Sequence, residues 1–494
     1  MSATPHDPGS VSHDERRARR AAVIALGGYA ASKVLVFISS PLLSYLIAPD
    51  VRGLVELVNP VVIGIELVSD LGIGPAIIQS QLGSDRTFLG VAWTIQAVRG
   101  AILSLVVCAL AWPYAELTGH PELAHILPIA GLAALGSGLL STKIFTTSRE
   151  LAIGRLTAVE LGAQIVGFVV KMVWAYYSPT AWSLVGGGLA IIFTKLVLSH
   201  ALLPGALDRP RWDPAIAREL ARFGRWVLAS TLLTFLTGHA DRWIFGALIP
   251  LGMLGLFGNA AVIAALPVEV VGQLASRVVF PLYARVLQSG GELAPVFQRA
   301  RRPLLVIGGW AIAGLVAGAP TAMRLLWDED WWGSGWMIQI LVFASWFRLC
   351  ETTNGAALLA RGEPRWLAAG SLAKLIAMCV AIPIGYAMGG FLGALVAYAS
   401  TEVVRYAVSV WAVSRIGLQG GLREDLAGTL MIAATGIGGW QIAELARAWG
   451  VPVIAEAALV AVVVTLAWAP LAMPAVISML RERRARTAMA PARA

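Results

Sequence analysis

Residues 87–113 read TFLGVAWTIQAVRGAILSLVVCALAWP, and Arg99 is the only charged residue among them. A helix needs about 20 apolar residues to cross roughly 30 Å of hydrocarbon, so this stretch can span a bilayer. Similar stretches follow one another along nearly the whole chain, separated by short charged clusters. The 494 residues are 57% hydrophobic and 14% charged, whereas soluble domains average about 25% charged residues. These patterns predict an all-α polytopic membrane protein, and they exclude secreted enzymes, soluble kinases and DNA-binding factors.

We expect about fourteen transmembrane helices, at 21–48, 53–79, 87–113, 123–147, 156–177, 181–204, 217–249, 252–285, 303–326, 336–360, 366–387, 391–414, 425–447 and 452–480. A basic cytoplasmic linker at 206–216 separates two lobes of six helices each, at 21–205 and 217–415. Two additional helices follow in 416–480. The remaining parts are an N-terminal tail at 1–20 and a basic C-terminal tail at 481–494, both predicted to be cytoplasmic.

The distribution of positive charge predicts the orientation. The net charge is +9, and the basic residues gather in the tails and in every second loop. The opposite set of loops holds only three of the 38 Lys and Arg residues, namely Arg52, Arg324 and Arg447. Positive residues favour the cytoplasmic side. We therefore expect both termini in the cytoplasm of a bacterium and the spans in its plasma (inner) membrane.

Two segments about 200 residues apart resemble each other. One runs Ile47-Ala48-Pro49, then Gly53-Leu54 and Asn59; the other runs Leu248-Ile249-Pro250, then Gly255-Leu256 and Asn259. Internal duplication of this kind is typical of transporters, in which the substrate site lies between the repeats. Chance matching of a few small residues is the alternative interpretation.

Several stretches resemble the polysaccharide-exporter branch of the multidrug/oligosaccharidyl-lipid/polysaccharide superfamily, the Wzx-like lipid-linked oligosaccharide flippases. The most specific is SDLGIGPAIIQ at 69–79, and the others are SYLIAPDVRG at 44–53, GHPEL at 119–123, RFG at 222–224, GHADRWIFG at 238–246 and RVVFPLYAR at 277–285. The resemblance implies two six-helix lobes around a central cavity, alternating access, and outward flipping of undecaprenyl-diphosphate-linked glycans. One departure is His239, because the family often has Asn two residues before the Asp that is Asp241 here.

Cationic residues inside the expected spans are candidates for binding an anionic substrate. A charge at mid-bilayer costs roughly 2.5–3.5 kcal/mol on insertion scales, so it normally faces a cavity or a partner. A lipid diphosphate would need Arg or Lys, which bind phosphate oxygens. We therefore expect the substrate-binding cations to be Lys33, Arg99, Lys195, Arg348 and Arg242.

The alternative is that these cations are neutralised inside the protein. Arg348 with Glu351, and Arg405 with Glu402, have the i,i+3 spacing that places both residues on one helix face. Asp241 is adjacent to Arg242 but is expected on a different face of the helix. Lys143 and Lys374 lie near the cytoplasmic ends of their spans, where their ammonium groups could reach water.

Three acidic residues are candidates for ion coupling. Glu66 and Asp70 are four residues apart on one helix face, and two neighbouring carboxylates suit proton or cation coupling. Their alternative role is to pair with Lys33 or Arg99. Glu269 lies in mid-span beside Pro267.

Neither an enzyme nor a metal site is expected. The three cysteines and six histidines have no metal-ligand spacing, and no loop is large enough for a catalytic domain. We expect no cofactor, with a proton or sodium gradient as the candidate energy source. The expected partners are a polyprenyl-diphosphate-linked oligosaccharide, membrane lipids and polysaccharide polymerase or export proteins, without nucleic acid. The alternative functions are a cation-coupled drug antiporter and, less favoured, a membrane glycan polymerase or glycosyltransferase.

Overall fold

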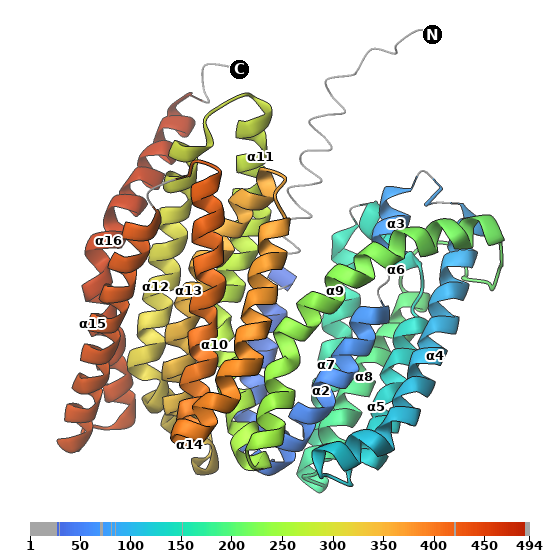
Figure 1. The fold of residues 1–494 in the computed structure, drawn as a ribbon, viewed down its shortest axis with the longest axis horizontal. Coiled ribbons are helices and arrows are strands. Elements are labelled where there is room, and N and C mark those ends of the chain that lie inside the picture. The colour runs from blue at the N-terminus through green and yellow to red at the C-terminus, as the bar shows by residue number, and fades with distance from the viewer. Residues whose placement is uncertain are drawn as a thin grey trace. The chain divides into compact units, whose positions relative to one another are not determined.

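The computed structural model describes residues 27–28, 30–69, 73–80, 82–83, 85–150, 152–418 and 421–489. Within these ranges every regular element is a helix (Figure 1), as the apolar spans predict. In chain order the elements are Ala30–Ser44, α2 (Pro49–Ser69), α3 (Ile73–Gln79), α4 (Arg86–Thr118), α5 (Leu123–Gly138), α6 (Lys143–Arg149), α7 (Ile153–Tyr177), α8 (Ala181–Ala201), α9 (Pro214–Leu248), α10 (Leu251–Leu274), a π-helical turn (Ala275–Val279), α11 (Phe280–Gln288), α12 (Leu293–Leu326), a 3₁₀ turn (Glu329–Trp331), α13 (Ser334–Ala360), α14 (Arg365–Arg415), α15 (Gly421–Ala448) and α16 (Val453–Met489).

The chain is a multi-pass membrane protein. Among the described helices eight are long and apolar enough to span a membrane, and the bent pair α5–α6 makes a ninth if it forms one span. The expectation of about fourteen spans is consistent with the helices, because each expected span overlaps a helix or a pair of broken helices. Two of those spans fall on α14, whose backbone leaves the helical conformation at Gly389 and at Gly390 (φ +56°).

By their contacts the helices form two compact units, Met1–Gly255 and Leu256–Ala494. In the first unit α9 contacts α2, α3 and α4, so the helix that follows the predicted linker packs with the helices before it. The lobe boundaries expected at 206–216 stay a prediction.

In the first unit, α5 lies between α4 and α8. The chain bends by 51° between α5 and α6, and such a break leaves helix-end carbonyls without their usual partners. The buried Gln96 side chain of α4 satisfies two of them, because its Nε2 donates to the carbonyls of Ser137 (3.1 Å) and Leu140 (3.2 Å). Gly100 and Gly138 permit this close approach, since a Cβ on Gly100 would lie 2.8 Å from the Gly138 Cα.

A reciprocal backbone contact within the first unit supports the internal duplication. A Cβ on Gly53 would lie 1.9 Å from the carbonyl oxygen of Leu251, and a Cβ on Gly255 would lie 2.0 Å from that of Pro49. Leu251 follows Pro49 by 202 residues in the chain, and Gly255 follows Gly53 by the same 202 residues. Equivalent positions of the two segments therefore contact each other in the same way, and only glycine fits there.

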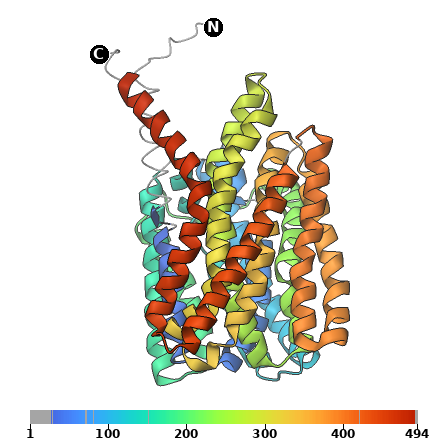
Figure 2. The ribbon, with the colours of Figure 1, turned by 90° about the vertical axis from the view of Figure 1, so that its left-hand side faces the viewer.

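In the second unit, α12 contacts α13, α15 and α16. Figure 2 looks onto this side, where α16, in red, runs beside α12. The fully buried Glu456 of α16 holds the three helices together, because its carboxylate lies 2.6 Å from Arg324 of α12 and 2.8 Å from Arg447 of α15. The helix pair α15–α16 is thus fixed to α12 by ion pairs as well as by apolar packing.

A second buried network connects four helices of the same unit. Arg301 of α12 lies 2.7 Å from Asp425 of α15 and donates to Thr353 of α13. Tyr406 of α14 donates to the same Asp425 carboxylate at 2.6 Å. Because each of these charges has a partner, the network needs no ligand, and we assign it a structural role.

Candidate functional site

Five charged side chains gather on two neighbouring helices of the second unit, and we call them the charged cluster: Arg348, Glu351, Lys374, Glu402 and Arg405. The first two lie on α13 and the other three on α14. Charges in a membrane-spanning segment are costly, and they normally face a partner or a functional cavity. The cluster is therefore the candidate functional site of this unit.

The turn at Gly389 and Gly390 brings the two arms of α14 together. A Cβ on Gly385 would lie 2.5 Å from the carbonyl oxygen of Gly393, and one on Gly393 would lie 2.1 Å from that of Gly385. The missing side chains therefore let the arms approach backbone to backbone. As a result Lys374 of the first arm meets Glu402 of the second.

Two ion pairs form inside the cluster. The Lys374 ammonium lies 2.6 Å from Glu402 Oε1, and both side chains are buried. The same ammonium lies 5.7 Å from the ring centroid of Tyr398, within the range of a cation–π interaction. Arg405 Nη2 lies 3.1 Å from Oε2 of the buried Glu351.

The cluster has an excess of positive charge, because three cations face two carboxylates. Arg348 is half-buried, and its side chain makes no ion pair or hydrogen bond with the part of the chain that the structure describes. It acts on Glu351 and Glu402 only at longer range. The buried Nε of Arg405 also has no hydrogen-bond partner. The site thus offers one unneutralised cation and an unused donor, which suit an anion.

The expected pairings within this cluster were wrong. The sequence spacing predicted Arg348 with Glu351 and Arg405 with Glu402, but the carboxylates exchange partners across helices. The expected position of Lys374 near water was also wrong, because the glycine turn buries it against Glu402. Lys143 is likewise buried, and its Nζ donates to the carbonyl of His200 at 3.0 Å.

Arg242, one of the expected substrate cations, lies close to two acidic side chains. Its guanidinium lies 2.7 Å from Asp241 and 3.6 Å from Glu56 of α2. Glu56 also lies 3.6 Å from Arg52. The two side chains pair although adjacent residues of a helix lie on different faces, because the long Arg side chain bends back to its neighbour.

The other three expected cations lie half-buried on three helices of the first unit. Lys33 is on Ala30–Ser44, Arg99 on α4 and Lys195 on α8. A cavity of about 250 Å³ between α2, α5 and α8 has apolar walls and Asn59, and none of the three cations is among its lining residues. Their role in substrate binding stays a prediction.

The ion-coupling candidates also stay predictions. The Glu66 backbone belongs to α2, but its side chain lies outside the description, and Asp70 lies outside the described residues altogether. Glu269 is half-buried on α10. Over the described ranges, no group of three or more His, Cys, Asp or Glu residues could hold a metal ion.

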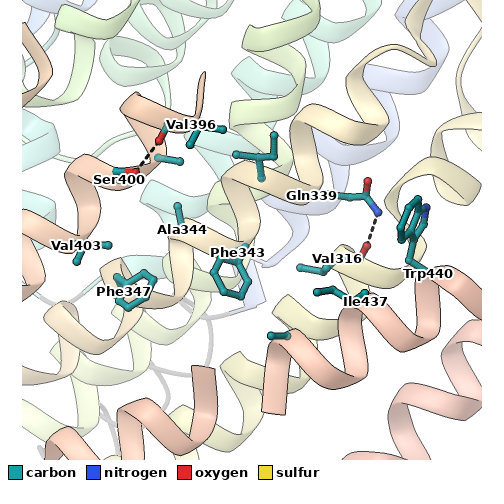
Figure 3. A pocket seen from close by; sticks show the side chains of 13 residues that line it. Val316, Gln339, Phe343, Ala344, Phe347, Val396, Ser400, Val403, Ile437 and Trp440 are labelled. Atoms are coloured by element: carbon teal, nitrogen blue, oxygen red, sulfur yellow. Dashed lines mark hydrogen bonds between the residues drawn. The ribbon is translucent and has the colours of Figure 1, made fainter. Parts of the chain in front are cut away.

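An apolar cavity of about 470 Å³ lies between α12, α13, α14 and α15 (Figure 3). Two polar side chains of its walls are hydrogen-bonded to the backbone: Gln339 donates to the carbonyl of Val316, and Ser400 to that of Val396, each at 2.8 Å. Phe343 and Phe347 supply aromatic surface. The walls are thus mainly apolar and suit a hydrocarbon chain.

A family model described as "Polysaccharide biosynthesis protein" matches residues 42–334, more than half of the chain. The teichuronic acid biosynthesis protein TuaB of Bacillus subtilis (strain 168) is 21% identical over 383 residues, which cover 75% of this chain and 78% of TuaB. The lipopolysaccharide biosynthesis protein WzxC of Escherichia coli (strain K12) is 22% identical over 358 residues, covering 70% and 71% of the two chains.

A solved structure shares the fold. The lipid II flippase MurJ in its inward closed conformation superposes with a TM-score of 0.71, covering 92% of this chain and 99% of MurJ. The sequences are only 10% identical, so this likeness concerns the fold alone. It agrees with the all-α transporter architecture expected from the apolar spans.

Proposed function

Because the chain belongs to the polysaccharide biosynthesis protein family, we propose that it is a flippase for undecaprenyl-diphosphate-linked oligosaccharides. The substrate would move from the cytoplasmic to the outer leaflet of a bacterial plasma membrane during polysaccharide biosynthesis and export. The match to this family confirms the family resemblance seen in the sequence.

The observation that carries the proposal is the excess positive charge of the charged cluster. A diphosphate is a multiply charged anion, and its passage through a region of low dielectric needs cations that the protein does not already neutralise. Arg348 meets this requirement, and the free Nε of Arg405 adds a donor. A drug-cation antiporter would need the opposite balance, with a surplus of carboxylates.

The hydrocarbon part of such a substrate needs an apolar surface. The cavity in Figure 3 provides one on the same helices, α13 and α14, that carry the cluster. A polyprenyl chain could remain in the bilayer while its diphosphate binds inside. Transport would then proceed by rocking of the two six-helix lobes, without a cofactor and without chemical change of the glycan.

The remaining expectations form part of the same proposal. Both termini would be cytoplasmic, since the basic residues gather on that side. A proton or sodium gradient is the candidate energy source. Polysaccharide polymerase and export proteins are the expected partners, because they would receive the flipped glycan.

Deletion of the protein in its host tests this function. Lipid-linked oligosaccharide of normal length should accumulate on the cytoplasmic leaflet, because only its export is lost. The deletion strain should be rescued by the wild-type protein and by Arg361→Gln, a change at an exposed residue at the end of α13. Arg348→Gln should rescue poorly at equal membrane abundance, because loss of a charge-assisted contact of about 1.5–3 kcal/mol lowers affinity tenfold or more.

Two outcomes would overturn the proposal. Shorter or differently linked glycans in the deletion strain would favour a polymerase or glycosyltransferase. Normal glycan export combined with greater sensitivity to cationic drugs would favour the antiporter.

A further inference from the structure

A second cavity of the second unit lies between α12, α15 and α16, with one residue of α13 in its wall, and has a volume of about 340 Å³. It shares no lining residue with the cavity of Figure 3, and no residue of the charged cluster lines it. We call it the α12–α15–α16 slot. The proposed function assigns no role to this slot.

The interior of the slot is apolar although two indoles line it. The Nε1 of the buried Trp346 donates to Thr429 Oγ1 at 2.9 Å. The Nε1 of the buried Trp468 donates to Thr435 Oγ1 at 3.1 Å. Because both polar groups already have partners, the two rings offer only carbon surface to an occupant.

A glycine leaves space for the Trp346 ring in the wall of the slot. Gly428 of α15 lines the slot, and a Cβ there would lie 2.3 Å from the Trp346 ring. The rest of that wall is Ala427 and Met431. Small and flexible side chains on one side and fixed aromatic rings on the other are suited to a hydrocarbon chain.

The rim of the slot carries two opposite charges. Arg302 stands immediately before the apolar part of α12, and only Asp425 separates Glu424 from the apolar part of α15. Both are exposed, and within the described ranges no ion pair joins them. Charges at the ends of apolar spans lie at the level of lipid head groups. The rim therefore presents a separated cation and anion at that level.

We propose that the α12–α15–α16 slot binds a zwitterionic phospholipid with a primary amine, such as phosphatidylethanolamine. Its phosphate pairs with Arg302, its ammonium group pairs with Glu424, and one acyl chain lies against the indole rings of Trp346 and Trp468. An anionic head group without an amine would meet the unneutralised Glu424. A quaternary amine cannot donate a hydrogen bond to that carboxylate.

Such a lipid would join α15 and α16 to α12 at the end of the spans opposite the Glu456 ion pairs. Glu424 stands in the first turn of α15, whereas Arg447 stands in its last turn. At the Glu424 end the Arg301–Asp425 pair already joins α12 to α15, and the lipid would add a contact there that includes α16. Binding to the folded state alone stabilises it.

Native mass spectrometry of the full-length protein, after addition of defined phospholipids to the detergent-purified chain, tests the proposal. Phosphatidylethanolamine should be retained in preference to phosphatidylglycerol and phosphatidylcholine. Arg302→Gln and Glu424→Gln should each weaken its binding about tenfold, as expected for one charge-assisted contact. The control Arg423→Gln, at an exposed neighbour that does not line the slot, should bind like the wild type.

A steric variant tests the position of the acyl chain. Ala427→Phe should fill the slot and abolish the preference, whereas Ala434→Phe, at an exposed alanine outside it, should leave the preference intact. Equal retention of the three lipids by the wild type would overturn the proposal, and this measurement requires no variant. Equal retention by the Ala427→Phe and Ala434→Phe proteins would also overturn it. Displacement of phosphatidylethanolamine by undecaprenyl diphosphate would assign the slot to the transport substrate instead.

Discussion

The pair between Lys374 and Glu402 lies in a membrane-spanning part of α14 and can be broken without changing the size of the side chain. Lys374→Met removes the ammonium that lies 2.6 Å from Glu402 Oε1. The other oxygen, Oε2, is buried and has no hydrogen-bond partner, so the variant leaves a buried carboxylate without a close donor. Breaking a buried ion pair by removing one partner costs about 3–5 kcal/mol. We expect a loss of this size in the free energy of unfolding.

An exposed pair of equal length provides the matched control. Arg365 Nε also lies 2.6 Å from a carboxylate oxygen, that of Glu363, but the Arg365 side chain is 72% exposed. Arg365→Met should therefore cost about 0–1 kcal/mol. The double variant Lys374→Met/Glu402→Met should recover most of the loss, because apolar replacement of a whole buried pair is often neutral. Steric trapping in bicelles measures these free energies. A cost below about 1 kcal/mol for Lys374→Met, or no recovery in the double variant, would refute the reasoning.

Three further predictions follow from other contacts. Gly53→Ala should destabilise the protein by about 1–3 kcal/mol, because the new Cβ would lie 1.9 Å from the Leu251 carbonyl oxygen. Gly438→Ala is the control and should not destabilise it, since a Cβ there would have no atom within 4 Å. Equal stability of the two variants would contradict this prediction. Glu456→Gln should lower the free energy of unfolding by about 1.5–3 kcal/mol, because it weakens the contacts with Arg324 and Arg447. Thermal unfolding measures this loss, and Glu444→Gln is the control because its carboxylate is more exposed. In a cysteine-free background an impermeant thiol reagent should label Glu122→Cys and Asp330→Cys in intact cells but not Arg361→Cys, and the reverse pattern would overturn the predicted orientation.

The sequence was sufficient to predict the fold because bilayer thickness and charge distribution leave few choices. A stretch such as residues 87–113 can hardly avoid forming a helix, since in hydrocarbon its backbone must satisfy its own hydrogen bonds. The boundary expected between the spans 366–387 and 391–414 coincides with Gly389 and Gly390, where α14 leaves the helical conformation. The reciprocal contact of Gly53 and Gly255 was not predicted, since the similarity of the two segments indicated only an internal duplication.

The partners of the charged residues could not be predicted in the same way. Spacing along one helix suggested Arg348 with Glu351, but Glu351 pairs with Arg405, which lies on another helix. The long side chains of Arg and Lys reach several neighbours, and tertiary packing decides among them. Lys374 and Glu402 are 28 residues apart, and only the close packing of Gly385 on Gly393 brings them together. The tertiary structure, and not the spacing in the sequence, therefore leaves Arg348 without an ion pair to the described residues.

Transbilayer movement of the substrate by the purified protein tests the central claim most directly. Undecaprenyl-diphosphate-linked oligosaccharide would be added to the outer leaflet of proteoliposomes, with and without a proton or sodium gradient, and its exposure to an impermeant glycosidase followed. We predict that protein-containing vesicles protect the glycan with time, that Arg348→Gln slows this about tenfold, and that Arg361→Gln does not. Protection no faster than in protein-free vesicles under any gradient, or equal rates for Arg348→Gln and the wild type, would contradict the account.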